Sequence, residues 1–166
     1  MIHTLDEFIP LWTGESDATL KMLRALTDAS LAQPVSSGGR TLGHIAWHTA
    51  LTIREMMERT GLAIEGPAPD APAPMEAKAI ADAYEASSRS LVEAIKKDWT
   101  DASLALEDNL YGGLWTRATT LTVLINHQIH HRGQMTVLMR QAGLRVPGVY
   151  GPAKEDWAAM GMEALP

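Results

Sequence analysis

The chain has 166 residues, of which 46% are hydrophobic, and a net charge of −6 at pH 7. This length and apolar content predict one domain over residues 1–166 with a single core. The absence of cysteine excludes disulfides, cysteine-ligated metal sites and a cysteine nucleophile, and the acidic balance argues against nucleic acid as a partner. The N-terminus has no signal-peptide pattern, and no stretch has the roughly 18–20 apolar residues that cross a bilayer. We therefore expect a cytoplasmic protein without membrane contact.

The first two predicted helices cover residues 4–29 and 41–60, where apolar residues recur at helical spacing. Thr4 followed by Glu7 fits an N-terminal capping box. A turn-rich loop, SLAQPVSSGGR, separates the two helices. The second helix is predicted to stop at Gly61, because glycine readily adopts the left-handed conformation that ends helices.

The third and fourth predicted helices cover residues 75–98 and 116–142, and the last one ends at Gly143. Before the third helix, the stretch EGPAPDAPAP has four prolines and predicts a long crossover connection. Residues 99–115 have an irregular pattern, and the tail 146–166 predicts a packed coil with a last short helix. The sequence therefore predicts an all-α four-helix bundle with a long crossover loop and a C-terminal tail.

The last helix contains the stretch INHQIHHRGQ, which holds three of the six histidines in the chain. At about 100° per residue, His127 and His131 lie on the stripe that the leucines define as inward, whereas His130 lies at its edge. An i,i+4 pair of histidines can hold one metal ion from a single helix. Such a pair can also be two core side chains that hydrogen-bond to their neighbours.

The second helix supplies two further candidates, His44 and His48, which are again four residues apart and phased to face the core. Four inward histidines without a metal would be costly, because each buried imidazole nitrogen needs a partner. In an acidic chain without cysteine, this concentration of histidine favours a metal site over core packing.

Three stretches together resemble a known family: TLGHIAWH, then YGGLWTRATTLTVLINHQIHHRGQM, then VPGVYGP. They resemble the DinB branch of the DinB/YfiT-like family of metal-dependent four-helix-bundle proteins, and the resemblance extends over nearly the whole chain. It implies one divalent metal ion held by His48, His127 and His131, and it favours a homodimer. His44 is the main rival of His48 as the ligand from the second helix.

The resemblance also implies a function, because the superfamily includes thiol-dependent S-transferases and maleylpyruvate isomerase. These enzymes use small thiols such as bacillithiol, mycothiol or glutathione. Three neutral imidazoles leave positions open on a divalent ion, which is typical of a reactive site. We expect a metal-dependent enzyme, a transferase or hydrolase, that acts on a small molecule with a low-molecular-weight thiol. The alternative is a non-catalytic, stress-related protein that binds a metal or another ligand. Zinc and nickel are the leading expectations among the metals that imidazoles suit.

Five further residues are candidates for supporting the metal ligands or lining the pocket. They are His44, Glu55, His130, Gln134 and Tyr150. Glu55 has a second interpretation as an ion-pair partner of Arg54 or Arg59. Gln134 could hydrogen-bond a ligand histidine, and the phenol of Tyr150 could reach a ligand from the turn-rich VYGP stretch.

A second apolar strip lies on the last helix, away from His127 and His131. It consists of Ile125, Ile129, Thr136 and Met139. A surface helix in a monomer would be more polar there, so the strip is predicted to contact either the C-terminal tail or a second subunit. Arg132, off the central stripe, is expected to form a structural salt bridge or to bind a substrate anion.

Overall fold

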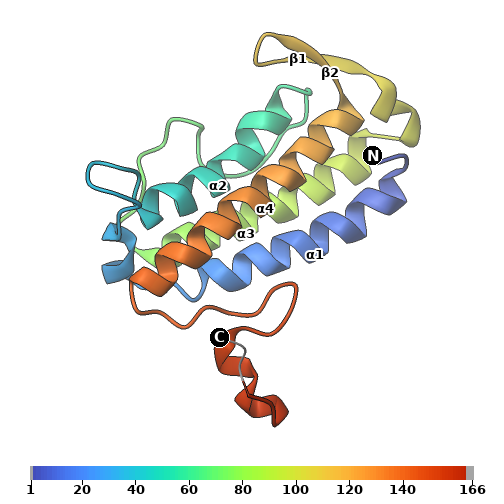
Figure 1. The fold of residues 1–166 in the computed structure, drawn as a ribbon. Coiled ribbons are helices and arrows are strands. Elements are labelled where there is room, and N and C mark those ends of the chain that lie inside the picture. The colour runs from blue at the N-terminus through green and yellow to red at the C-terminus, as the bar shows by residue number, and fades with distance from the viewer. Residues whose placement is uncertain (1, 164–166) are drawn as a thin grey trace.

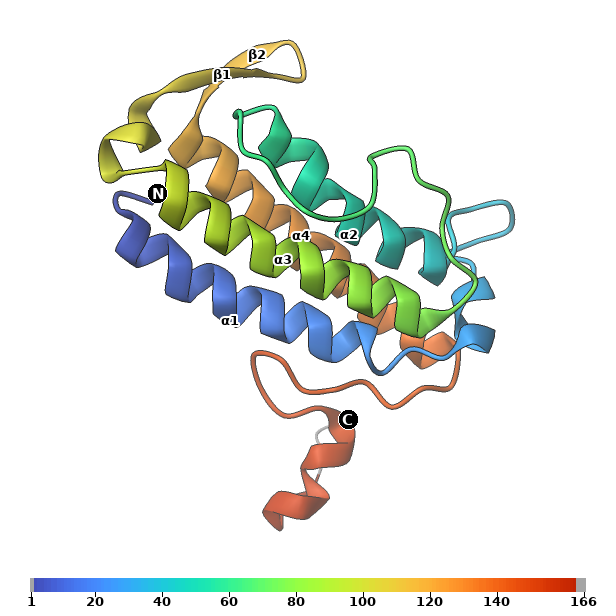
Figure 2. The ribbon, with the colours of Figure 1, turned by 180° about the vertical axis from the view of Figure 1, so that it is seen from behind.

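The structure is a computed structural model that describes residues 2–163, and its main body is a bundle of four long helices (Figure 1). These helices are α1 (Leu5–Leu23), α2 (Leu42–Glu58), α3 (Ala77–Asp98) and α4 (Arg117–Gln141). Helices α1 and α4 run in one direction, and α2 and α3 run in the other (Figure 1). Because α2 and α3 are parallel, the chain must return along α2 between them, and residues 59–76 do so (Figure 2). The predicted four-helix bundle with its long crossover loop is confirmed.

The crossover loop is attached to α2 by two side chains. The indole Nε1 of Trp47 donates to the Ala71 carbonyl at 2.8 Å, and Arg54 donates to the Gly66 carbonyl at 2.8 Å. The two carbonyl oxygens belong to a loop outside any helix or sheet, so these side chains supply hydrogen bonds that regular secondary structure would otherwise provide. They keep the loop on the outer side of α2 and away from the face that α2 turns toward α4.

Helix ends follow local signals in the sequence. In each of α1, α2 and α4, a threonine hydroxyl accepts the N–H of the residue three positions later, and these caps are Thr4, Thr41 and Thr116. Such a cap typically contributes about 1 kcal/mol. Gly61 and Gly143 follow α2 and α4 with φ of 82° and 74°, the left-handed conformation that the sequence predicts there.

The first predicted helix is shorter than expected. Helix α1 ends at Leu23, and a separate 3-10 helix, η1 (Asp28–Ala32), follows it. The reason is a second cap, because the Thr27 hydroxyl accepts the N–H of Ser30 at 3.3 Å and so starts a new turn.

Residues 99–115, predicted to be irregular, contain regular structure. A 3-10 helix, η2 (Asp101–Ala105), precedes an antiparallel hairpin of β1 (Glu107–Leu110) and β2 (Gly113–Thr116). The hairpin turns at Tyr111 and Gly112, both with positive φ (53° and 84°), as two-residue hairpin turns require. The sequence did not reveal it, because four-residue strands are too short to show clear alternation.

The C-terminal tail is packed near its start and extends away from the bundle near its end (Figure 1). Val146 is buried, and Lys21 of α1 donates to the Gly148 carbonyl at 2.9 Å. Beyond them, the short 3-10 helices η3 (Lys154–Asp156) and η4 (Ala158–Met160) take the place of the expected last helix. The prediction of a packed coil therefore holds for the first part of the tail.

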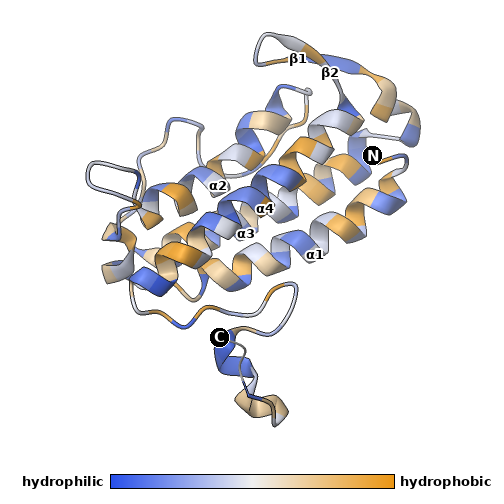
Figure 3. Ribbon diagram, viewed as in Figure 1, coloured by the Kyte–Doolittle hydropathy of each residue, from blue (hydrophilic) through white to orange (hydrophobic). Residues whose placement is uncertain are grey.

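The core lies between the four helices and includes the fully buried side chains of Phe8, Trp12, Met57, Tyr84 and Leu91. Hydrophilic residues occupy the middle of α4 (Figure 3). This is the part of α4 that carries the histidines. Among residues 2–163, no helix is long and apolar enough to cross a membrane.

The second apolar strip of α4 is covered mostly by the chain itself. Ile125 is 6% exposed and Met139 is fully buried, and Ile125 lies beside Ile2, which precedes α1, and Leu11 of α1. Thr136 lies beside the C-terminal tail, which agrees with the prediction that the tail covers this strip. Since α1 and the tail cover this strip, it gives no separate reason for a second subunit, and the homodimer stays a prediction.

The start of α2 is packed closely against η1, and Gly43→Ala tests this contact. A Cβ at Gly43 would lie 3.0 Å from the Cβ of Leu31 and 3.1 Å from its carbonyl oxygen. We expect Gly43→Ala to lower the free energy of unfolding by about 1–2 kcal/mol, because η1 must move away. In contrast, a Cβ at Gly133 of α4 meets nothing within 4 Å, so Gly133→Ala should raise it by about 0.5–1 kcal/mol. Urea denaturation followed by circular dichroism measures the free energy of unfolding of both variants. If the two substitutions change it equally, the close contact between α2 and η1 is contradicted.

Candidate metal centre

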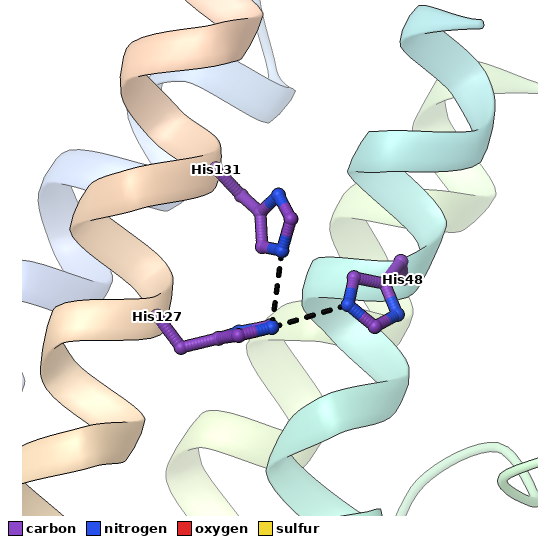
Figure 4. A group of neighbouring side chains, drawn as sticks. All are labelled: His48, His127 and His131. Atoms are coloured by element: carbon purple, nitrogen blue, oxygen red, sulfur yellow. Dashed lines mark hydrogen bonds between the residues drawn. The ribbon is translucent and has the colours of Figure 1, made fainter. Parts of the chain in front are cut away.

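Three histidines converge between α2 and α4 (Figure 4). The Nε2 atom of His127 lies 3.1 Å from Nε2 of His48 and 3.0 Å from Nε2 of His131. Each residue offers one ligand atom, and these three atoms all lie within 4.8 Å of one another. We call these three residues the histidine triad. The triad joins one residue of α2 to two residues of α4 that are one helical turn apart.

The position of α2 relative to α4 is fixed directly beside the triad. Gln128, which is fully buried, donates from its side-chain amide to the Thr49 carbonyl at 3.3 Å. This bond joins the two helices at the residues that follow His127 and His48. The sequence analysis missed Gln128, because a buried glutamine becomes informative only when its partner on another helix is known.

Hydrogen bonding sets the tautomer of His131. Its Nδ1 lies 2.8 Å from the side-chain oxygen of Gln134, and an amide oxygen can only accept. Nδ1 of His131 therefore carries the proton, and its Nε2 presents a lone pair to the centre of the triad. The amide nitrogen of Gln134 lies 3.1 Å from Nε2 of His130 and donates to it. The contact between Gln134 and a ligand histidine, suggested by the sequence, is thus present.

The donor set of the triad fits a divalent metal ion. Nε2 of His127 contacts Nε2 of both other histidines. A ring nitrogen of a neutral imidazole either carries one proton or has one lone pair, so it forms a hydrogen bond with only one of these two neighbours. Nδ1 of His127 is buried without a hydrogen-bond partner among the described residues. A cation would accept all three lone pairs at once. Ligands roughly 2.0–2.1 Å from a common ion lie about 2.9–3.4 Å apart, and the two measured separations of 3.0 and 3.1 Å agree with this.

The triad is held in the neutral form that metal ligation requires. Burial, and after it the charge of the neighbouring His131, lower the pKa of both His48 and His127 to about 4. Burial also lowers the pKa of His131, and the hydrogen bond that His131 donates to Gln134 acts in the opposite direction. At neutral pH an incoming ion therefore does not have to displace the second proton of an imidazolium from His48 or His127.

His44 and His130 lie outside the triad. The sequence predicted that His44 faces the core, but it is exposed, because it lies in the first turn of α2 at the end of the bundle. The group of converging histidines contains His48 and not its rival His44. His130 is exposed beside His131, with ring centroids 4.9 Å apart, as expected for an edge position.

Glu55 has two partners. It forms the predicted ion pair with Arg59 at 2.8 Å, and it accepts a hydrogen bond from the Tyr111 hydroxyl at 2.5 Å. The Arg59 guanidinium also lies over the Tyr111 ring, 5.1 Å from its centroid. The hairpin tip is thereby fastened to α2 two turns beyond His48. Tyr111 escaped the sequence analysis, since its role depends on the hairpin.

Tyr150 lies elsewhere in the molecule. Its side chain is 71% exposed, and its hydroxyl donates to Glu15 of α1 at 2.7 Å. The same carboxylate pairs with the buried Arg132 at 2.5 Å, and Arg132 also contacts the Tyr150 hydroxyl. The structure therefore joins Tyr150 to a salt bridge between α1 and α4 and does not bring it to the triad. The salt-bridge interpretation of Arg132 is confirmed.

The comparison with protein families identifies the family of this chain. A family model described as the DinB family matches residues 1–164. The chain belongs to the DinB family. The histidine triad therefore lies in a bundle of the kind that the sequence resemblance implied.

Three known proteins match most of the length of this DinB-family chain. The uncharacterized protein YrdA from Bacillus subtilis (strain 168) is 51% identical over 164 residues, which are 99% of this chain and 98% of that protein. A crystal structure of a DinB-like protein from Bacillus cereus ATCC 10987 has 48% identity and a TM-score of 0.87, and the match covers 90% of this chain and 100% of that one. A DinB-like protein from Bacillus subtilis, YjoA, has a TM-score of 0.68 at 16% identity, over 86% of this chain and 96% of that one, and shows the shared fold alone.

The lowered pKa values predict a particular pH dependence of stability in metal-free protein. The unfolded chain takes up protons on its histidines near pH 6.5, whereas folded His48 and His127 do so near pH 4. The unfolded state therefore binds more protons between these values, and the free energy of unfolding falls as the pH falls from 6.5 to 4. His127→Leu should show a shallower fall. Urea denaturation in the presence of a chelator, between pH 6.5 and 4, measures how the free energy of unfolding of each protein changes with pH. Equal slopes for the unaltered protein and His127→Leu would contradict the lowered pKa of His127.

Proposed function

We propose that the chain binds one divalent metal ion through His48, His127 and His131 and acts as a metal-dependent enzyme of the thiol-transferase type. The observation that carries this proposal is the convergence of three neutral imidazoles: Nε2 of His127 lies 3.0 and 3.1 Å from Nε2 of His131 and His48, and the three ligand atoms all lie within 4.8 Å of one another. A small-molecule substrate and a homodimer belong to the same proposal, because the family resemblance implies both. Zinc and nickel are the proposed metals, since imidazole nitrogen suits each of them.

The triad favours a reactive site over a structural one. A structural zinc site closes the ion with four protein ligands, whereas the converging group among residues 2–163 has three. His48 and His127 are only partly buried, so a small molecule can approach them. A divalent ion with an open position lowers the pKa of a bound thiol or water and so supplies a nucleophile near neutral pH.

The chain's own residues support this chemistry in two ways. Gln134 holds the His131 ring with its Nε2 lone pair toward the triad. His130, exposed next to it, accepts a hydrogen bond from the Gln134 amide through Nε2, which holds Gln134 in the orientation that its contact with His131 requires. Because the chain has no cysteine, the sulfur in a thiol reaction would come from a small molecule.

The alternative is a protein that binds a metal or another ligand without turnover. One observation favours it. Glu55, the carboxylate whose charge acts on His48, is occupied by Arg59 and Tyr111 and is not free to act as a general base. The experiment below separates the two functions.

Metal content and thiol transfer test the proposal together. Chelator-treated protein reloaded with zinc or nickel should hold one ion per chain, measured by plasma mass spectrometry. The loaded protein should then join a low-molecular-weight thiol to an electrophile from a broad panel, with adducts detected by mass spectrometry. His127→Ala should lose both properties, with a drop in metal affinity larger than the roughly 10–100-fold that loss of an outer hydrogen-bond partner costs.

The matched control is His3→Ala, which removes an exposed histidine outside the triad and should keep both properties. Full metal content in His127→Ala would show that the ligands are wrongly assigned. Metal binding without adducts across the whole panel would support the non-catalytic alternative.

A further inference from the structure

Gln134 is the side chain that the structure places behind one histidine of the triad. Its oxygen lies 2.8 Å from Nδ1 of the buried His131, whereas Nε2 of the same ring faces His127. Gln134 follows His131 by three residues, so the two side chains meet on one face of α4. The other triad histidine of α4 differs, because Nδ1 of His127 is buried without a hydrogen-bond partner among the described residues. Only one of the two α4 ligands therefore has its ring fixed from behind.

The orientation of the Gln134 amide decides which tautomer His131 adopts. With the amide oxygen toward His131, Nδ1 carries the proton and Nε2 keeps its lone pair. An amide turned by 180° would donate to Nδ1, and the proton would then lie on Nε2, which could not bind a cation. His130 favours the first orientation, because its Nε2 accepts from the Gln134 amide nitrogen at 3.1 Å. Two exposed side chains thus support the metal-binding form of a buried histidine.

The Gln134 amide supports His131 without adding a charge, and no carboxylate pairs with the triad. The ion pairs of the described residues all join arginine or lysine to a carboxylate, and none includes a histidine. A carboxylate behind a metal-binding histidine raises the basicity of the ring and strengthens its bond to the ion. Its negative charge also weakens the attraction between the ion and an anionic ligand. An amide fixes the ring and leaves this attraction undiminished.

We propose that Gln134, oriented by His130, is a positioning residue that tunes the triad in two ways. It fixes the metal-binding tautomer of His131, and, as a neutral group, it leaves the full charge of the ion to attract an anionic ligand such as a thiolate. Affinity for the ion is then lower than a carboxylate would give, and attraction for the thiolate is higher. This role rests on the proposed function, since it concerns how the same site treats its ion and its thiol.

Two substitutions of Gln134 test this role in the whole chain. Competition with a chelator measures the affinity for cobalt, and the sulfur-to-cobalt absorption band measures the affinity of the loaded protein for 2-mercaptoethanol. Gln134→Glu keeps an oxygen that accepts from His131 but adds a charge at an exposed position. It should bind cobalt about 3-fold more tightly and the thiol about 3-fold more weakly. Gln134→Met removes the hydrogen bond at similar side-chain length and should bind cobalt about 10-fold more weakly.

Nitrogen-15 NMR of the His131 ring reads the tautomer without a metal. The unaltered metal-free protein should carry the proton on Nδ1 and leave Nε2 unprotonated. His130→Ala should increase the share of the tautomer with the proton on Nε2, because the Gln134 amide is then free to turn. The same substitution combined with Gln134→Glu should leave the tautomer unchanged, because both oxygens of a carboxylate accept.

The matched control is Gln141→Glu, which adds the same charge at an exposed position near the end of α4 and should change neither affinity. The proposed role is overturned if Gln134→Glu weakens both affinities, as structural damage would, or changes neither. It is also overturned if Gln134→Met binds cobalt as tightly as the unaltered protein, or if His130→Ala leaves the His131 tautomer unchanged. If the unaltered protein binds no cobalt, or its cobalt form binds no thiol, the proposed function fails and the tuning role fails with it.

Discussion

The approach of the His127 ring to the rings of His48 and His131 is the constraint on which the rest of the site depends. Nε2 of His127 lies 3.1 Å from Nε2 of His48 and 3.0 Å from Nε2 of His131, and it cannot form a hydrogen bond with both of them. The bundle maintains this arrangement through the packed core between α2 and α4 and through the buried bond from Gln128 to the Thr49 carbonyl. A fold that holds three lone pairs together in this way is prepared for a cation.

The periodicity of α4 was sufficient to predict half of this geometry. The relative phase of His127 and His131 is a property of one helix, so a sequence can show it. The choice between His44 and His48 depends on how far α2 slides along α4, which periodicity leaves open; here the family resemblance supplied the answer. Tyr150 could not be placed at all, because it lies in a tail whose path depends on Glu15 and Arg132.

The charged residues around the triad show why contacts matter more than residue types. Arg132 and Glu55 are both attractive candidates from the sequence, yet each is engaged, Arg132 by Glu15 and Glu55 by Arg59.

The central claim is that these three histidines hold one divalent ion, and anomalous diffraction tests it most directly. Crystals of zinc- or nickel-loaded protein, measured on both sides of the metal absorption edge, should show one anomalous peak per chain between α2 and α4. That peak should lie roughly 2.0–2.1 Å from Nε2 of His48, His127 and His131. The absence of a peak there, or a peak bound instead by His44 or by carboxylates elsewhere, would contradict the account.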